Sequence, residues 1–156
     1  MSEMTLKPQG DREIVVVRPF NAPRDLVFDA FTKPELVQRW MLGTDGWSMP
    51  VCRIDFRVGG KGRYEWKSPD GQHGMALSTE FVEIDRPARI VHKEVFDGTP
   101  QPVEAVITST FVEEAGRTTL TMVIRYPTPQ VRDFMLKSGM EKGMALSFTR
   151  LAGLLA

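Results

Sequence analysis

The spacing of apolar and polar residues changes along the chain and predicts a definite order of elements. Residues 13–20 (EIVVVRPF) are β-branched and apolar, which is typical of a strand. Apolar residues at helical spacing predict two short helices between about residues 23 and 41. Alternating segments from Val51 to Tyr126 predict six strands joined by short turns. Residues 129–155 then return to helical spacing and predict one amphipathic helix roughly 40 Å long.

The order β-αα-ββββββ-α predicts an α+β fold in which a curved antiparallel sheet wraps around a long C-terminal helix. Six successive strands form a meander, which the first strand can join to give seven strands in all. The last helix must cover the concave face, but a helix is only about 10 Å wide. Either large side chains or a cavity therefore fills the remaining space. Residues 1–11 are polar and expected to be flexible, and residues 12–156 are expected to form a single domain.

Alternation along the strands predicts which side chains face the last helix. The opposite face is expected to be polar and solvated, with Arg53, Arg63, Lys67, Glu80, Lys93, Thr108, Thr110, Thr119, Thr121 and Arg125. The face toward the helix is expected to be mostly apolar, with Ile54, Phe56, Tyr64, Trp66, Leu77, Thr79, Phe81, Ile90, His92, Glu94, Phe96, Ala105, Ile107, Ser109, Phe111, Leu120, Met122 and Ile124. A mostly apolar surface with a few polar groups is typical of a small-molecule pocket.

Composition and charge exclude several classes of function. Twenty basic and twenty acidic residues give a net charge of zero, so no basic surface is expected to attract nucleic acid. The apolar runs are too short for membrane insertion, and the N-terminus has no apolar signal-peptide region. One cysteine, Cys52, cannot form an internal disulfide, which favours a cytoplasmic protein. The protein is expected to be a monomer or a homodimer.

His92 and Glu94 are the most distinctive polar residues, because they share a predicted strand face with Ile90 and Phe96. The pair could act as acid and base, could be a polar anchor for a ligand, or could be a hydrogen-bonded structural pair. Residues two apart on a strand are about 6.5–7 Å apart at Cα, so contact between the two side chains is not assured.

Other catalytic and cofactor chemistry has little support in the sequence. Only two histidines are present, no metal-binding motif occurs, and no metal or cofactor is expected. Cys52 has no neighbouring base and reads as a small hydrophobic residue. The glycines near residues 59–62 and 71 join strands and do not open a helix, so they predict turns and not a phosphate-binding loop.

The predicted cavity residues combine inward strand positions, aromatic residues near the second helix and one face of the last helix. Aromatic rings can stack on a flat ligand, methionines adapt to irregular shapes, and a glycine leaves room; ordinary core packing is the alternative. These candidates are Trp40, Trp47, Phe56, Tyr64, Trp66, Leu77, Thr79, Phe81, His92, Glu94, Ile107, Ser109, Met122, Met140, Gly143, Met144 and Phe148.

Four segments carry a resemblance to a known family: RPFNAPRDLVFDAFTKPELVQRW (18–40), FRVGGKGRYEWKSPDG (56–71), FVEIDRPARIV (81–91) and SGMEKGMALSFTRLAGLL (138–155). From Glu13 onward the chain resembles the bacterial branch of the activator-of-heat-shock-protein-90-ATPase-like family. This family lies within the START-like (helix-grip, SRPBCC) superfamily. The resemblance implies a sheet gripping a C-terminal helix around a hydrophobic cavity, and relatives that bind lipids, polyketides or other apolar ligands.

The chain departs from the family pattern at three places that affect the cavity. Met41 follows Trp40 where a second tryptophan is frequent, and Gly62 and His92 stand where aromatic residues are common. These changes remove bulk and add polarity, so they imply a ligand preference different from that of the relatives.

Three functions remain open from the sequence. The leading hypothesis is a non-enzymatic START-like domain that binds a small apolar or aromatic molecule, with a stress-response or chaperone-related role. The second is a cyclase- or hydratase-type enzyme that uses His92 and Glu94. The third is an interaction module that acts on a chaperone ATPase or another protein partner, which requires an exposed apolar patch.

Overall fold

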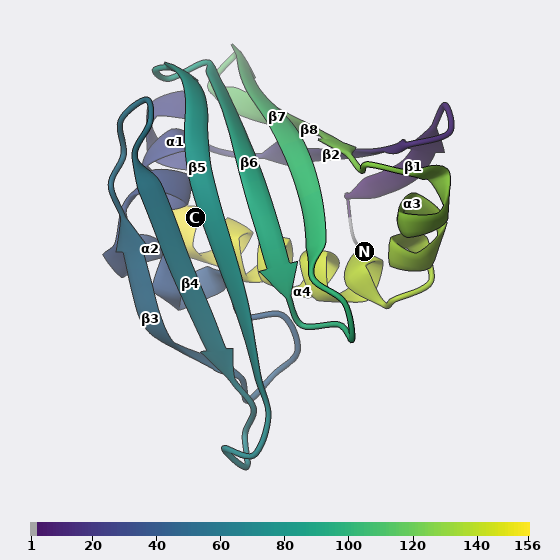
Figure 1. Cartoon of the computed structure of the whole chain (residues 1–156). Helices are drawn as coiled ribbons and strands as arrows, with labels where there is room; N and C mark the ends of the chain where they lie inside the picture. Colours follow the sequence, from purple (N-terminus) through teal and green to yellow (C-terminus); the bar gives the residue numbers. More distant parts are fainter. Residues whose placement is uncertain (1–2) are drawn as a thin grey trace.

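The structure is a computed structural model that describes residues 3–156. One antiparallel sheet forms the body of the molecule, and helix α4 runs across one side of it (Figure 1). In chain order the elements are β1 Thr5–Gln9, β2 Glu13–Phe20, α1 Arg24–Thr32, α2 Pro34–Trp40, β3 Ser48–Ile54, β4 Lys61–Lys67, β5 Gly74–Asp85, β6 Arg89–Asp97, β7 Val103–Glu114, β8 Arg117–Arg125, α3 Pro129–Leu136 and α4 Met140–Leu155. The predicted α+β class and curved antiparallel sheet are confirmed.

The strands follow the order β1-β2-β8-β7-β6-β5-β4-β3, so β3 to β8 form the predicted meander. Strand β2 joins β8 at the other end of the meander, with Ile14 opposite Ile124 and Phe20 opposite Thr118. Strands that follow one another closely in the sequence therefore lie side by side. Their inward residues form one continuous surface facing α4.

The sheet has eight strands where the sequence predicted seven. The extra strand, β1, lies within residues 1–11, which we expected to be flexible; residues 1 and 2 lie outside the described part. Its sequence TLKPQ has a single β-branched residue, and Pro8 cannot donate to a ladder, so local propensity did not reveal it. The strand forms at the sheet edge because it pairs with β2, where Thr5 lies opposite Val17.

The C-terminal segment forms two helices, so the prediction of one helix over 129–155 is wrong. Thr128 caps α3, and its hydroxyl accepts a hydrogen bond from the Val131 N–H at 3.1 Å. Helix α3 ends at Leu136, and Gly139 then adopts a φ of +87° before α4 begins. This left-handed conformation suits glycine and interrupts the helical path. Helix α4 is consequently the part that crosses the sheet.

An aromatic part of the apolar core lies where α1, α2 and the C-terminal half of α4 meet the sheet. Phe148 of α4 stacks on Trp40 of α2, with ring centroids 5.9 Å apart. Phe28 of α1 meets Phe111 of β7 edge to face at 5.3 Å. The Trp40 indole N–H donates a hydrogen bond to the Ala30 carbonyl at 2.9 Å. This packing fills one end of the space between sheet and helix.

Candidate functional site

A cavity of about 330 Å³ lies between the sheet and α4, beside the aromatic core. We call it the inner chamber. Its walls come from strands β4 to β8, from α4 and from the segment that follows α2, and they are mostly apolar. The candidates that line it are Trp40, Tyr64, Trp66, Leu77, Thr79, Phe81, His92, Glu94, Ile107, Ser109, Met122, Met140, Gly143, Met144 and Phe148.

A second space of about 520 Å³, the outer chamber, adjoins the first and shares Glu94, Met140 and Met144 with it. It is bordered by the loop between β6 and β7, which contributes Gly98, and by the junction between α3 and α4. Trp47, a predicted cavity residue, lines this outer chamber and not the inner one. The two spaces together give the inner chamber a route toward the surface.

Phe56 is the candidate that lines neither chamber. Its ring packs between Phe28, at a centroid distance of 5.7 Å, and Phe81, at 5.1 Å. The prediction assumed that β3 continues through residue 56, but the strand ends at Ile54. Beyond that point alternation no longer sets the direction of the side chain, and Phe56 becomes part of the core.

Several lining residues were missed by sequence reasoning. Leu42 and Gly43 come from the loop after α2, which has no periodic pattern that could place it. Ser147 is polar, whereas the prediction for the last helix rested on its apolar stripe. Met75 shares strand parity with Leu77, so alternation could have found it.

The register of the sheet brings the polar candidates together. Thr79 of β5 lies directly opposite Glu94 of β6, and Phe81 lies opposite His92. Because alternate residues share a face, His92 and Glu94 of β6 both point toward α4. The antiparallel pairing of β5 and β6 thus builds a small polar region in an apolar wall.

His92 and Glu94 approach one another without forming a hydrogen bond. The distance from His92 Nε2 to Glu94 Oε1 is 3.7 Å, and the side chains are 18% and 15% exposed. Among the described residues, the His92 imidazole is the one basic group within 4 Å of the Glu94 carboxylate, and it carries a positive charge only when protonated. The carboxylate therefore faces the chambers without a cationic partner fixed by the protein.

Two phenols lie near the same carboxylate. Burial raises the pKa of Tyr64, and the negative charges of Cys52 and Glu94 raise it further. Burial also raises the pKa of Tyr126, again with a contribution from Glu94. The Thr79 hydroxyl lies close enough to influence Tyr64, yet Thr79 Oγ1 makes no hydrogen bond of normal geometry in residues 3–156.

Helix α4 presents an open position to the inner chamber at Gly143. A Cβ atom placed there would meet nothing within 4 Å outside the local helix backbone. Met140 lies about one turn before Gly143 and Met144 follows it directly, and both methionines line the two chambers. This part of the helix is thin, as the sequence predicted, and the space beside it is unfilled by the described residues.

The C-terminal half of α4 is fastened to the loop that follows α2. The Arg150 guanidinium donates hydrogen bonds to the carbonyls of Trp40 at 3.0 Å and Gly43 at 3.1 Å, and contacts Asp45 at 3.2 Å. The Gly43 N–H donates to Ser147 Oγ at 2.9 Å. These contacts fix the loop that closes the inner chamber next to the core.

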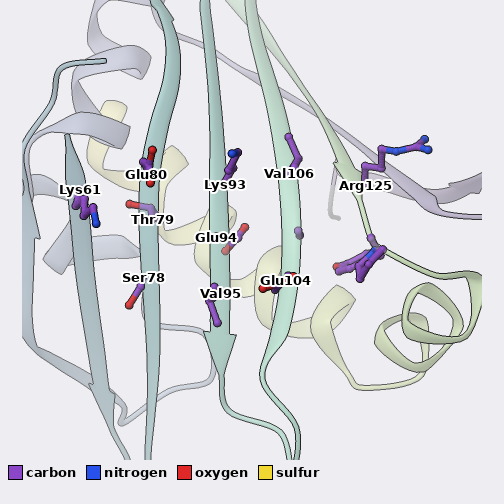
Figure 2. A pocket seen from close by; sticks show the side chains of 13 residues that line it. Lys61, Ser78, Thr79, Glu80, Lys93, Glu94, Val95, Glu104, Val106 and Arg125 are labelled. Atoms are coloured by element: carbon purple, nitrogen blue, oxygen red, sulfur yellow. The ribbon is translucent and has the colours of Figure 1, made fainter. Parts of the chain in front are cut away.

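A third hollow, of about 580 Å³, lies on the face of the sheet opposite α4 (Figure 2). Its surface is formed by outward residues such as Lys93 and Val95. Charges of opposite sign are direct cross-strand neighbours here, with Glu80 between Lys61 and Lys93. This arrangement is that of a solvated sheet face, so the chambers beneath α4 are the better candidate site.

The described part of the chain gives little support for a metal site, a reactive thiol or a membrane-spanning helix. Residues 3–156 contain no group of three histidine, cysteine or acidic side chains that could hold a metal ion. Burial, with the nearby Glu35 charge, raises the pKa of Cys52 to about 11, which disfavours the reactive thiolate. No helix in these residues has the length and apolar character needed to cross a bilayer.

The family model described as activator of Hsp90 ATPase homolog 1-like protein matches residues 21–156. The chain belongs to this family. The resemblance noted in the sequence is therefore confirmed, and membership of the activator-homologue family supports a ligand-binding domain in general. No curated protein matches the chain.

Solved structures from several bacteria share the fold. A protein from Rhodobacter sphaeroides matches with a TM-score of 0.90 and 27% identity, over 98% of this chain and 97% of that one. A protein from Staphylococcus epidermidis matches with a TM-score of 0.79 and 28% identity, over 97% and 93% of the two chains. A Mycobacterium smegmatis protein, at 23% identity, has a TM-score of 0.85 over 98% and 97% of the chains and bears on the fold alone.

Proposed function

We propose that this protein binds a small apolar or aromatic molecule in the inner chamber, between the sheet and α4. The observation that carries the proposal is the chamber itself, a space of about 330 Å³ with aromatic and methionine walls and a few polar groups. Pockets of about 300–1,000 Å³ with this lining are typical of small-molecule sites. Burial of apolar ligand surface would drive binding, at about 25 cal/mol per Å² before ordering costs.

The geometry of the polar pair favours binding over catalysis. An acid–base pair normally has its base held by a hydrogen bond to an orienting group. His92 Nε2 lies 3.7 Å from Glu94 Oε1, beyond hydrogen-bond distance, and the structure gives the imidazole no hydrogen bond to residues 3–156. The pair thus serves better as a polar anchor than as a cyclase or hydratase centre.

A protein-interaction module is also less well supported. The large apolar side chains exposed in residues 3–156 are distributed over several elements, from Leu26 on α1 and Val112 on β7 to Phe134 on α3. Docking to a chaperone or another partner would favour one continuous apolar patch. The apolar lining of the chambers is the more distinctive feature.

The proposal is tested by filling the chamber from α4. Gly143→Leu places a side chain in open space beside Met140 and Met144, and leucine is a better helix former than glycine. We expect this variant to bind the neutral apolar dye N-phenyl-1-naphthylamine at least about tenfold more weakly than the unaltered protein. Dye fluorescence during titration measures the affinity.

The matched control is Gly153→Leu, in the same helix. Gly153 is exposed, lies outside the chambers, and also has nothing within 4 Å of an added Cβ. We expect this variant to bind the dye as the unaltered protein does. Absence of dye binding by the unaltered protein, or equal affinity in the two leucine variants, would refute the proposed function.

A further inference from the structure

Building on the proposed function, we infer that the molecule bound in the inner chamber carries a positively charged amine, and that Glu94 selects it. The ligand class is thus a cationic aromatic or apolar amine, in preference to neutral or acidic molecules of the same shape. The inference rests on the Glu94 carboxylate, which accepts no hydrogen bond from residues 3–156 and has only His92 as a basic neighbour at 3.7 Å, and on the groups that surround it.

Glu94 offers acceptors that the protein does not use. An ionised carboxylate has two oxygens and accepts hydrogen bonds only. The side chain is 15% exposed and lines both chambers, yet no donor in residues 3–156 forms a hydrogen bond with it. A carboxylate with so little contact with water gains most from a charged donor, and the ligand is the group that can supply one.

The surroundings of Glu94 supply no fixed positive charge. Its neighbours across the strands are Thr79 and Ala105, and Met140 lies on the helix side. Lys142 lines the outer chamber but is exposed, and it forms no ion pair with Glu94 in the described structure. His92, 3.7 Å away, would offset the Glu94 charge only when protonated, so a ligand with a carboxylate or phosphate head would meet a like charge beside a neutral imidazole.

Thr79 provides a second, independent indication. This residue is only 6% exposed and lines the inner chamber, and its Oγ1 makes no hydrogen bond of normal geometry in the part of the chain described, although it lies near the Tyr64 hydroxyl. It lies opposite Glu94, so two unused acceptors are neighbours. A protonated amine has three donors and can satisfy both groups. The stacked rings of Tyr64 and Trp66, 6.2 Å apart between centroids, add faces that attract a cation.

The test uses three probes that share one apolar body and differ in the head group. They are 2-naphthylmethylamine, which is cationic at neutral pH, 2-naphthylmethanol, which is neutral, and 2-naphthoate, which is anionic. Titration calorimetry of the unaltered protein is expected to show the amine binding about tenfold tighter than the alcohol. The naphthoate is expected to bind more weakly than the alcohol.

Two matched variants assign the preference to Glu94. Glu94→Gln keeps the shape but removes the charge, and we expect it to bind the amine and the alcohol with nearly equal affinity. Glu104→Gln removes the same charge from the neighbouring strand, where Glu104 is exposed on the opposite face of the sheet, and we expect it to keep the preference. Unchanged affinity of Glu94→Gln for the alcohol shows that its chamber is intact.

The outcomes separate this inference from the proposed function. If the alcohol binds but the amine binds no tighter, or if Glu104→Gln alters the preference as much as Glu94→Gln, the inference is wrong and the chamber still binds apolar molecules. If Glu94→Gln loses affinity for every probe, Glu94 is structural and the inference is also overturned. If no probe binds the unaltered protein, both ideas fail.

Discussion

Single residues in this protein show how an apolar wall modifies polar side chains. Tyr64 and Tyr126 are the two tyrosines of the chain, and burial raises the pKa of each, with a further contribution from Glu94. Both phenols belong to the region around the chambers. Their ionisation therefore reports on whether that region stays closed.

We predict that the folded protein shows little phenolate at pH 10, the ordinary pKa of tyrosine. Because the pKa of each phenol is raised by folding, the stability that this provides is present below pH 10 and is lost as the pH rises further. Ultraviolet absorbance of phenolate, compared between native and urea-unfolded protein, measures the effect. Half-ionised tyrosine in the native protein at pH 10 would contradict it.

Most of the site could be predicted at the residue scale because strand alternation leaves little freedom. His92, Glu94 and Thr79 were placed on the helix side of the sheet from parity alone, and the structure places them there. Parity could not predict Phe56, since the strand ends before it. Whether the predicted residues hold a ligand stays a prediction.

Where helices and strands form and end depends partly on backbone conformations and strand pairing that side-chain patterns do not reveal. The apolar stripe continues from α3 into α4, so periodicity suggested a single helix, but Gly139 adopts a positive φ between them. Strand β1 was missed for the opposite reason, because its stability comes from pairing with β2 and not from its own residues. A backbone dihedral angle thus ended the helix, and pairing with a neighbouring strand formed β1, in each case against the preference of the local sequence.

Two glycine substitutions are predicted to act with opposite sign on stability. Gly139→Ala forces a residue with a Cβ into the left-handed region and should lower the free energy of unfolding by about 1 kcal/mol. Gly143→Ala, inside α4, should raise it by about 0.5–1 kcal/mol. An added Cβ meets nothing within 4 Å at either site, so backbone effects dominate. Urea unfolding measures both free energies, and an equal increase in the free energy of unfolding from both substitutions would refute the prediction.

For the whole molecule, the fold could be predicted because each segment has a clear period and short connections. A meander of short-turn strands and one covering helix leave few alternative arrangements. What the sequence could not decide is how much of the space between them remains open. That depends on how the side chains of distant segments fit together, such as Leu42 and Phe148, which no periodicity encodes.

Helix α4 is held unequally along its length. Phe148 and Arg150 bind its C-terminal half to α2 and the following loop, whereas its first turns, with Met140 and Gly143, border open space. A ligand bound in the inner chamber, as we propose, would therefore exchange by a local opening of those first turns while the aromatic core stays assembled. The rate of exchange is then independent of global unfolding.

Amide hydrogen exchange gives a direct measure of this asymmetry. Amides of residues 144–146 should exchange faster than those of residues 149–151, because local openings there disturb few packed contacts. Adding N-phenyl-1-naphthylamine should slow the first group more than the second. Equal protection in both groups, unchanged by the dye, would contradict this prediction. It would mean that α4 opens only as a whole, and that release of a ligand is as slow as global unfolding.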